Sequence, residues 1–389
     1  MLKLSKGNNS DSTTYADNLE QDDLSSYDKG LGLLVLLTVP LSWGTYAPIV
    51  KSIYEMEVPI PGLLFSAGYY LIAAITLSLL ALSSSEHGNE KSENRGNFIS
   101  TTESSKQSTS SQLLGGFELG SYLFIGNCLQ VVGLKEVPAD RAAFLVQLTT
   151  IFVPIVSATF AGNFNAVPIP TWFACIIAFL GVIIMGLDSP KTNDLSLLSI
   201  SNDLFRNGFS FSASDFLIVL AAFAYTMHVV RLSTYAKYTS PLGLAASKAT
   251  VEAGLSIGLV AALLNVGTTN VDFLNELSSD VHTYFSVIQS QITSGSFPPA
   301  GSDKAIVAVF WTAWVTCAYT IYAQSYGQRR VSATDANLIY SVQPVFSALF
   351  AWALLGEQLD IFGYIGAFLI GLAVWIVASL PEDSPVNKL

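Results

Sequence analysis

The chain of 389 residues is 51% hydrophobic and only 12% charged, whereas soluble globular domains carry about 25% charged residues. Its formal net charge is −11, and its mean hydropathy is +0.49. These values exclude a disordered chain, a basic nucleic-acid-binding protein and an ordinary soluble enzyme. They leave an integral membrane protein with many spans.

The chain begins with a polar stretch and continues with ten apolar runs. Residues 1–29 contain no apolar core of signal-peptide length, and we expect a disordered tail there. A helix of about 20 apolar residues crosses a bilayer, so each run predicts one transmembrane helix. The expected fold class is therefore an all-α, polytopic membrane protein. The ten expected spans are residues 31–50, 60–82, 113–134, 139–160, 168–187, 214–234, 242–265, 304–327, 333–355 and 360–380.

Polar segments separate some of these spans. Residues 83–112 are rich in Ser, Thr and Glu without an apolar period, and they predict a disordered loop. Residues 189–213 are expected to be a linker, and 381–389 a C-terminal tail. In the acidic segment 266–303, apolar residues recur at steps of mostly three and four, the spacing of one helix face. This segment predicts either an amphipathic helix on the membrane surface or a partly helical loop packed on the protein.

The distribution of basic residues predicts the orientation in the membrane. If the N-terminus faces the cytosol, or the stroma or matrix of an organelle, 11 Lys and Arg residues lie on that side and six on the other. This count leaves out Lys248, which lies within a span. Because basic residues gather on the cytosolic side, we expect both termini there, and we call it the inner side.

The two halves of the chain resemble each other. At a shift of 194 residues, Gln130 falls on Gln324. Each half has five spans, and an odd number gives the second half the opposite orientation. The sequence thus predicts an inverted repeat of two five-helix units, residues 30–188 and 214–380, which is the construction of many secondary transporters. Further pairs at this shift are Gly133 and Gly327, Val137 and Val331, Ala139 and Ala333, Ala142 and Ala336, Phe152 and Phe346, and Gly162 and Gly356.

Two segments carry a resemblance to a known family. Residues 333–357, ATDANLIYSVQPVFSALFAWALLGE, are similar to the ninth-helix signature of EamA-type carriers in the drug/metabolite transporter superfamily. Residues 140–154, DRAAFLVQLTTIFVP, are similar to the fourth-helix counterpart, and Trp43-Gly44 in the first span also fits. The resemblance implies transport of small molecules without ATP hydrolysis. It also implies a central cavity lined by the first, third, fourth, sixth, eighth and ninth helices.

Ionisable side chains within the spans are the first candidates for a substrate site. Lys248 and Glu252 lie four residues apart and share one helix face. Because charges at membrane depth are costly, one interpretation is that they bind an anionic or zwitterionic substrate or couple a proton. The other is a structural pair in which Lys248 reaches the near surface. His228 is either a titrating site residue or a packed core residue. Glu118 is either a proton-coupling residue or a solvated helix end.

Uncharged polar groups supply the rest of the candidate site. The repeat places Gln130 and Gln324 on equivalent faces of the two halves, where they contact substrate or tie helices together. Such groups suit a neutral, zwitterionic or amphipathic solute, since a phosphate site would hold several Lys or Arg residues. The predicted substrate-binding residues are Tyr46, Gln130, Gln147, His228, Lys248, Glu252, Gln324, Asn337, Tyr340 and Gln343.

Other residues are expected to serve the scaffold. Pro154 and Pro344 lie inside spans and predict kinks. Small-residue stripes in the fifth and tenth spans predict close packing, either of these spans on each other or at a homodimer interface. The His and Cys residues form no metal-ligand or disulfide pattern, and we expect neither a metal nor a cofactor. The stripes are Ala174, Ala178 and Gly181, and Gly363, Ala367 and Gly371.

The expected function is secondary transport of a small organic metabolite by alternating access, with an amino-acid-like, zwitterionic or amphipathic solute favoured. The alternative is a non-transporting membrane scaffold or receptor that uses the 266–303 loop. An intramembrane enzyme is not expected, because the sequence offers no cluster of catalytic His, Asp or Glu residues at one depth. The expected partners are the small-molecule substrate and the lipid bilayer, with no nucleic acid.

Overall fold

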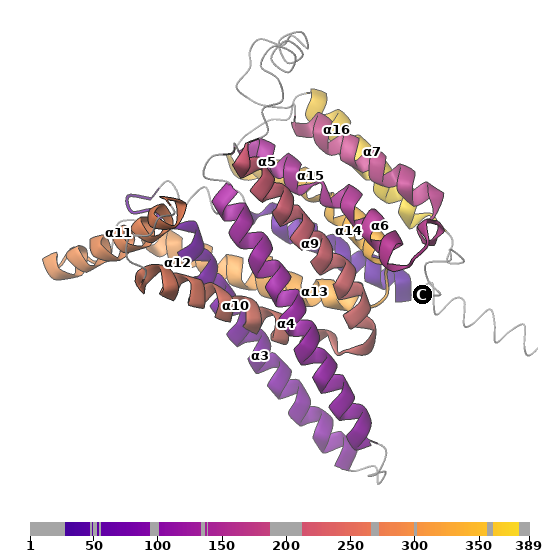
Figure 1. The fold of residues 1–389 in the computed structure, drawn as a ribbon, viewed down its shortest axis with the longest axis horizontal. Coiled ribbons are helices and arrows are strands. Elements are labelled where there is room, and N and C mark those ends of the chain that lie inside the picture. Colours follow the sequence, from indigo (N-terminus) through magenta and orange to yellow (C-terminus); the bar gives the residue numbers. More distant parts are fainter. Residues whose placement is uncertain are drawn as a thin grey trace, which may run out of the picture.

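The computed structural model describes most of the chain between its two ends. Within the described residues the chain forms helices and turns and no strand, which confirms the predicted all-α class (Figure 1). The predicted N-terminal tail up to residue 27, the C-terminal tail and nearly all of the 189–213 linker lie outside them. The described residues are 28–46, 49, 53, 56–93, 101–133, 137, 139–186, 212–265, 272–298, 302–355 and 361–380.

The helices follow the order of the predicted spans. The first helix covers residues 28–44. The next elements are α3 (Gly62–Glu93), α4 (Thr101–Gly133), α5 (Ala139–Val146), α6 (Thr149–Phe160), η1 (Phe164–Ala166) and α7 (Ile169–Gly186). The second half contains α9 (Ala213–Tyr238), α10 (Pro241–Asn265), α11 (Asp272–Ser294), α12 (Ser302–Trp311), η2 (Thr312–Tyr319), α13 (Thr320–Gly327), α14 (Ala333–Tyr340), α15 (Gln343–Leu355) and α16 (Ile361–Ala378).

Six helices in the described part of the chain are long and apolar enough to cross a membrane. Two other predicted spans, the fourth and the ninth, are divided by a short turn into α5 and α6 and into α14 and α15. The third lies within α4, whose first half is polar. The six are Gly62–Ser84, Ile169–Gly186, Ala213–Tyr238, Pro241–Asn265, Ser302–Gly327 and Ile361–Ala378.

The two divided spans show the sequence repeat in the backbone. The turns occupy residues 147–148 and 341–342, again 194 positions apart. The N–H of Gln147 donates to the Ala143 carbonyl over 3.2 Å, and the N–H of Ser341 donates to the Asn337 carbonyl over 3.1 Å. Both halves therefore contain the same interruption of the same helix. The following bonds match as well, from Leu148 to Leu145 and from Val342 to Ile339.

The two prolines of these spans have different roles. Pro154 lies inside α6, as the sequence predicts. Pro344 is the second residue of α15, directly after the turn that divides the predicted ninth span, so the expected interruption lies there and the proline ring fits the first helical turn. Thr150 occupies the equivalent position in the first half, so the interruption forms there without a proline.

The helices α7 and α16 lie side by side at one edge of the helix bundle (Figure 1). They meet at two glycines: a Cβ added to Gly181 would lie 2.9 Å from the carbonyl oxygen of Gly366. The predicted contact of the fifth and tenth spans is therefore confirmed. The predicted stripe of α16 is wrong in part, because Gly371 is exposed and the buried face runs through Gly363 and Gly366. In α7, the predicted Ala174, Ala178 and Gly181 are all buried.

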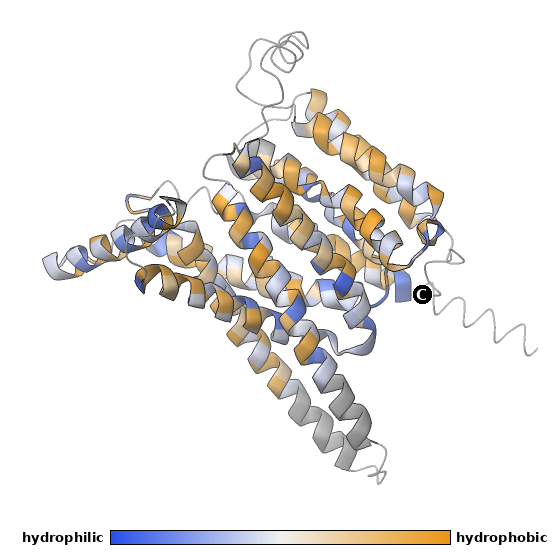
Figure 2. Cartoon of the chain, in the orientation of Figure 1, coloured by the Kyte–Doolittle hydropathy of each residue, from blue (hydrophilic) through white to orange (hydrophobic). Residues whose placement is uncertain are grey.

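The outward faces of these helices are apolar. Figure 2 shows α7 and α16 as largely hydrophobic, and Phe173, Phe368 and Trp375 have more than half of their surface exposed, at 61%, 68% and 66%. Exposed apolar surface on this scale is what a lipid environment requires. Because the glycine contact is formed within one chain, a homodimer remains a prediction that these two stripes do not support.

Two predicted loops contain helices. The disordered loop expected at 83–112 differs from the structure, in which α3 continues to Glu93 and α4 begins at Thr101. The sequence has no proline between Pro61 and Pro138, and a helix that is already formed extends at little cost. In the 266–303 segment, the expected helix is α11, which packs on the end of α10. Its Ser278 hydroxyl donates to the Leu263 carbonyl over 2.8 Å.

Candidate substrate-binding site

A cavity of about 310 Å³ lies in the middle of the helix bundle, and we call it the central cavity. Its walls come from the first helix, α3, α4, α9, α10, η2, α13 and α15. This volume is at the lower end of the range for small-molecule sites. Its aromatic lining residues are Trp43, Tyr46, Tyr69, Tyr70 and Tyr225, its amides and hydroxyls are Asn127, Gln130, Thr316, Thr320, Gln324 and Gln343, and Glu252 and His228 also line it.

Several predicted site residues meet in this cavity. The repeat partners Gln130 and Gln324 both line it, from α4 and α13. Gln130 also accepts a hydrogen bond of 2.8 Å from the Tyr225 hydroxyl, so it ties α4 to α9 as well. Gln130 can therefore both contact a substrate in the cavity and tie two helices together, which were its two predicted roles. The predicted residues that line the central cavity are Tyr46, Gln130, His228, Glu252, Gln324 and Gln343.

Four predicted residues do not line the cavity. Asn337 and Tyr340 are buried on α14, which turns this face toward the first helix. The Tyr340 ring meets Trp43 edge-on with centroids 5.4 Å apart, and its hydroxyl accepts a hydrogen bond from Gln328. Gln147 lies half-buried in the turn between α5 and α6. The fourth residue, Lys248, is discussed next.

Lys248 and Glu252 are both completely buried on α10. The interpretation that Lys248 reaches the surface is therefore wrong, because α4 packs directly on this part of α10. A Cβ added to Gly120 of α4 would lie 2.6 Å from the Lys248 carbonyl oxygen. The predicted pair is not closed: neither Nζ of Lys248 nor either carboxylate oxygen of Glu252 has a hydrogen-bond partner among the described residues.

These two charges belong to a small electrostatic cluster. His228 on α9 interacts with Lys248, and Tyr70 and Tyr225 interact with Glu252. The Nε2 atom of His228 also has no hydrogen-bond partner within the described part of the chain. Buried charges without partners are strongly unfavourable unless a further group completes the site. Glu252 and His228 line the central cavity, so this group would occupy that cavity.

The sequence reasoning missed the π-helix η2 in the eighth span. π-helical turns are rare and occur often at functional sites. Thr316 and Cys317 of η2 line the central cavity, and the indole N–H of Trp43 donates to the Thr316 carbonyl over 3.2 Å. A signal was present, because Thr312, Thr316 and Thr320 recur at steps of four. Thr316 and Thr320 donate their hydroxyl hydrogens to carbonyls four residues earlier, a pattern that often bends helices.

Glu118 is half-buried and has partners on a neighbouring helix, so it is not a freely solvated helix end, and its role in proton coupling stays a prediction. It forms a two-point ion pair with Arg231 of α9, with distances of 2.5 Å to Nε and 2.9 Å to Nη2. The Tyr235 hydroxyl donates to the same carboxylate over 2.6 Å. This residue therefore ties α4 to α9 and does not face the central cavity.

An apolar cluster separates the central cavity from a second, larger cavity. Val229 lines the central cavity, and the next residue, Val230, lines a cavity of about 810 Å³ near the α13–α14 loop. Both belong to one buried cluster, which we call the apolar plug. Its members are Leu36, Val39, Val153, Val229, Val230, Ala323, Val331, Ala333, Ala336, Ile339 and Tyr340.

Long apolar helices, exposed apolar faces, a duplicated helix break and a polar cavity inside the bundle define an integral, multi-pass membrane transporter. The chain belongs to the EamA-like transporter family, which it matches over residues 30–187 and 212–379. This result confirms the resemblance found in the sequence.

Individual relatives agree with this assignment. A protein of Archaeoglobus fulgidus described as "Uncharacterized transporter" is 26% identical over 264 residues, which is 68% of each chain. A solved structure described only as "Crystal structure of protein" is similar with a TM-score of 0.58 at 16% identity. That similarity covers 90% of this chain and 96% of the other, and it concerns the fold alone.

Proposed function

We propose that the protein is a secondary carrier that moves a small amino-acid-like, zwitterionic or amphipathic metabolite by alternating access. In this proposal, Glu252 receives the ammonium group of the solute. The observation that carries it is the buried Glu252 carboxylate, which lines a cavity of aromatic side chains and forms no ion pair among the described residues.

The lining of the central cavity supports an ammonium-bearing solute. A carboxylate attracts an ammonium group by charge, and aromatic faces attract it through their ring quadrupoles. Tyr70 and Tyr225 interact with Glu252, so ring and carboxylate contacts are available at one place. The amides of Gln130 and Gln324 offer hydrogen-bond donors to the carboxylate or other polar end of the solute.

The repeat supports ten spans arranged as two inverted five-helix units. Many secondary transporters bind substrate near the midplane, beside helices interrupted at corresponding positions of their two halves. The turns at 147–148 and 341–342 are such a pair, and Gln343 brings the second of them to the central cavity. Both turns lie near the middle of their predicted spans.

The apolar plug supports alternating access. It lies between the two cavities, so passage between them requires its helices to separate. The first helix is held by close contacts: a Cβ added to Gly44 would lie 2.9 Å from the backbone carbon of Phe346 in α15. We expect these tightly packed helices to move as rigid bodies, as in rocking transporters.

The experiment is counterflow in liposomes that contain the full-length protein, with labelled amino acids outside and the unlabelled compound inside. Glu252→Gln removes the charge but keeps the size, and we expect at least a tenfold loss of uptake. Glu276→Gln, on the exposed face of α11, is the matched control and is expected to transport normally. If E252Q transports as well as the native protein, Glu252 does not bind the substrate. The scaffold alternative predicts that neither protein transports.

A further inference from the structure

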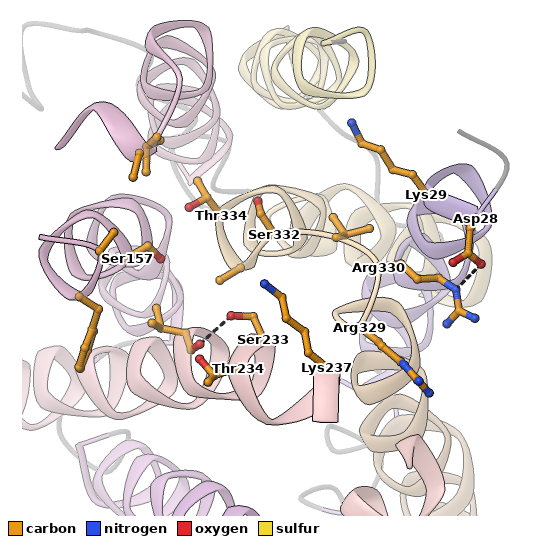
Figure 3. A pocket seen from close by; sticks show the side chains of 17 residues that line it. Asp28, Lys29, Ser157, Ser233, Thr234, Lys237, Arg329, Arg330, Ser332 and Thr334 are labelled. Atoms are coloured by element: carbon orange, nitrogen blue, oxygen red, sulfur yellow. Dashed lines mark hydrogen bonds and ion pairs between the residues drawn. The ribbon is translucent and has the colours of Figure 1, made fainter. Parts of the chain in front are cut away.

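The second cavity, of about 810 Å³, lies on the other side of the apolar plug from the central cavity, and we call it the vestibule. Its walls are formed by the start of the first helix, the ends of α6 and α9, and the loop between α13 and α14 (Figure 3). In the predicted orientation, all of these helix ends belong to the inner side. The vestibule thus lies where headgroups of the inner leaflet and inner solutes have access.

The vestibule is strongly basic. Arg330 is the one of its basic residues that is neutralised within the described structure: it forms an ion pair of 2.7 Å with Asp28 and lies over the Tyr326 ring. Of the described carboxylates, none lies within ion-pair distance of the other three basic residues. The basic residues that line the vestibule are Lys29, Lys237, Arg329 and Arg330, and its acidic residue is Asp28.

Lys237 is the best placed of these cations. Figure 3 shows its amine directed from the end of α9 into the middle of the vestibule, between Ser233 and Ser332. Lys29 lines the vestibule from the first helix, but Figure 3 shows its amine directed away from the Lys237 amine, and it interacts electrostatically with Asp335. Arg329 turns its guanidinium away from the middle.

Neutral groups around the vestibule also favour an anion. The buried hydroxyl oxygen of Ser157 on α6 has no hydrogen-bond partner among the described residues. Ser332 caps α14, and the first N–H groups of that helix lie at the same wall. Helix N-termini favour negative charge, but Asp335 in the first turn of α14 offsets part of this field, so the main attraction for an anion comes from the lysines.

We propose that the vestibule is a second binding site, which holds the phosphate group of an anionic ligand at the Lys237 amine, in the positive field of the other basic residues of the vestibule. Basic pockets between transmembrane helices on the inner side suit anionic lipid headgroups, and a free phosphate ion offers the same chemistry. The site differs from the central cavity, whose described lining has no Lys or Arg residue. The proposed phosphate site and the proposed ammonium-binding site are therefore formed by different residues in different cavities.

A ligand at this site would connect the first helix, α9 and the start of α14. The same three elements contribute Leu36, Val230 and Ala333 to the apolar plug. Binding therefore favours the conformation in which the plug is closed, and it stabilises the folded protein by mass action.

The test measures thermal unfolding of the full-length protein in a neutral detergent. The two probes are sodium phosphate and a short-chain phosphatidylglycerol. Sodium chloride at equal ionic strength and a short-chain phosphatidylcholine are the reference additions, because surface charge alone responds to any salt. Four variants are compared with the native protein: K237Q, K29Q, K237R and K304Q. Lys304, exposed at the start of α12, lines neither cavity and is the matched control.

We expect the midpoint of unfolding to rise with at least one probe in the native protein, K237R and K304Q. In K237Q, the concentration of the probe that gives the same rise is expected to be about tenfold higher, because one charge-assisted contact is lost. A rise with phosphatidylglycerol alone identifies a lipid headgroup, and a rise with phosphate identifies a free anion. No rise with either probe, or equal rises in K237Q and K304Q, overturns the proposal. If K237Q does not fold, K29Q takes its place in this comparison.

Discussion

Lys248 and Glu252 show how a buried charge is interpreted at the scale of single residues. Their spacing of four in an apolar run indicated one shared helix face, and both are buried there. The sequence did not reveal that both would lack a partner, because this depends on Gly120 bringing α4 onto α10. Tyr69 and Tyr70 line the central cavity but were not among the predicted site residues. A tyrosine in an apolar run is equally typical of a residue that anchors a helix at the membrane interface, so the sequence did not distinguish the two roles.

Replacing Lys248 by Met and Glu252 by Gln together is expected to increase stability and abolish transport. The double change removes two buried charges that form no ion pair of their own within the described structure and keeps the side-chain lengths. We expect a gain of about 1–2 kcal/mol, seen as a higher unfolding midpoint in detergent, together with the loss of counterflow. The exposed Lys304→Met change should alter neither quantity. A lower midpoint for the double variant would show that the two buried charges stabilise the fold.

At the scale of helices, apolar length predicted the spans well but not their interruptions. The apolar runs continue across the turns at 147–148 and 341–342, so hydropathy gives no boundary there. The repeat itself was detectable, since identities at a shift of 194 require only the sequence. The buried face of α16 could not be predicted from the sequence, because Gly366 and Ala367 lie three and four residues after Gly363 and both spacings are typical of one helix face. The partner helix decides between them.

Gly366→Ala is expected to destabilise the protein, and Gly371→Ala is its matched control. A Cβ at Gly366 would lie 2.5 Å from the Gly181 carbonyl oxygen and 2.7 Å from the Met185 nitrogen. Because both are backbone atoms, α7 and α16 must move apart, at a cost of roughly 1–3 kcal/mol. At Gly371 nothing lies within 4 Å, and alanine favours the helix. Equal unfolding midpoints for the two variants would contradict the described contact.

At the scale of the whole molecule, the central cavity and the vestibule both border the apolar plug. The repeat directed attention to Gln130 and Gln324, and both reached the central cavity because they occupy equivalent places in the two halves. The vestibule was not predicted. Its basic residues are far apart in the sequence, and only the folded chain brings Lys29, Lys237 and Arg329 together.

Val230→Asn in the apolar plug is expected to make the protein leaky. Valine at this position is 7% exposed, and an amide there would draw water between the two cavities. We expect several-fold faster passive efflux of small solutes from liposomes, without saturation. Val260→Asn is the control, because Val260 is 8% exposed in another cluster. Equal efflux from the two variants would show that the plug does not separate the cavities.

The central claim is that the central cavity binds an ammonium-bearing solute for transport. The most direct measurement loads liposomes containing the native protein with a mixed pool of amino acids, organic acids, sugar phosphates and nucleotide sugars. The compounds that leave are then identified by mass spectrometry. The account predicts selective efflux of amino-acid-like compounds, lost in E252Q. Selective efflux of sugar phosphates or organic acids without an ammonium group would contradict it.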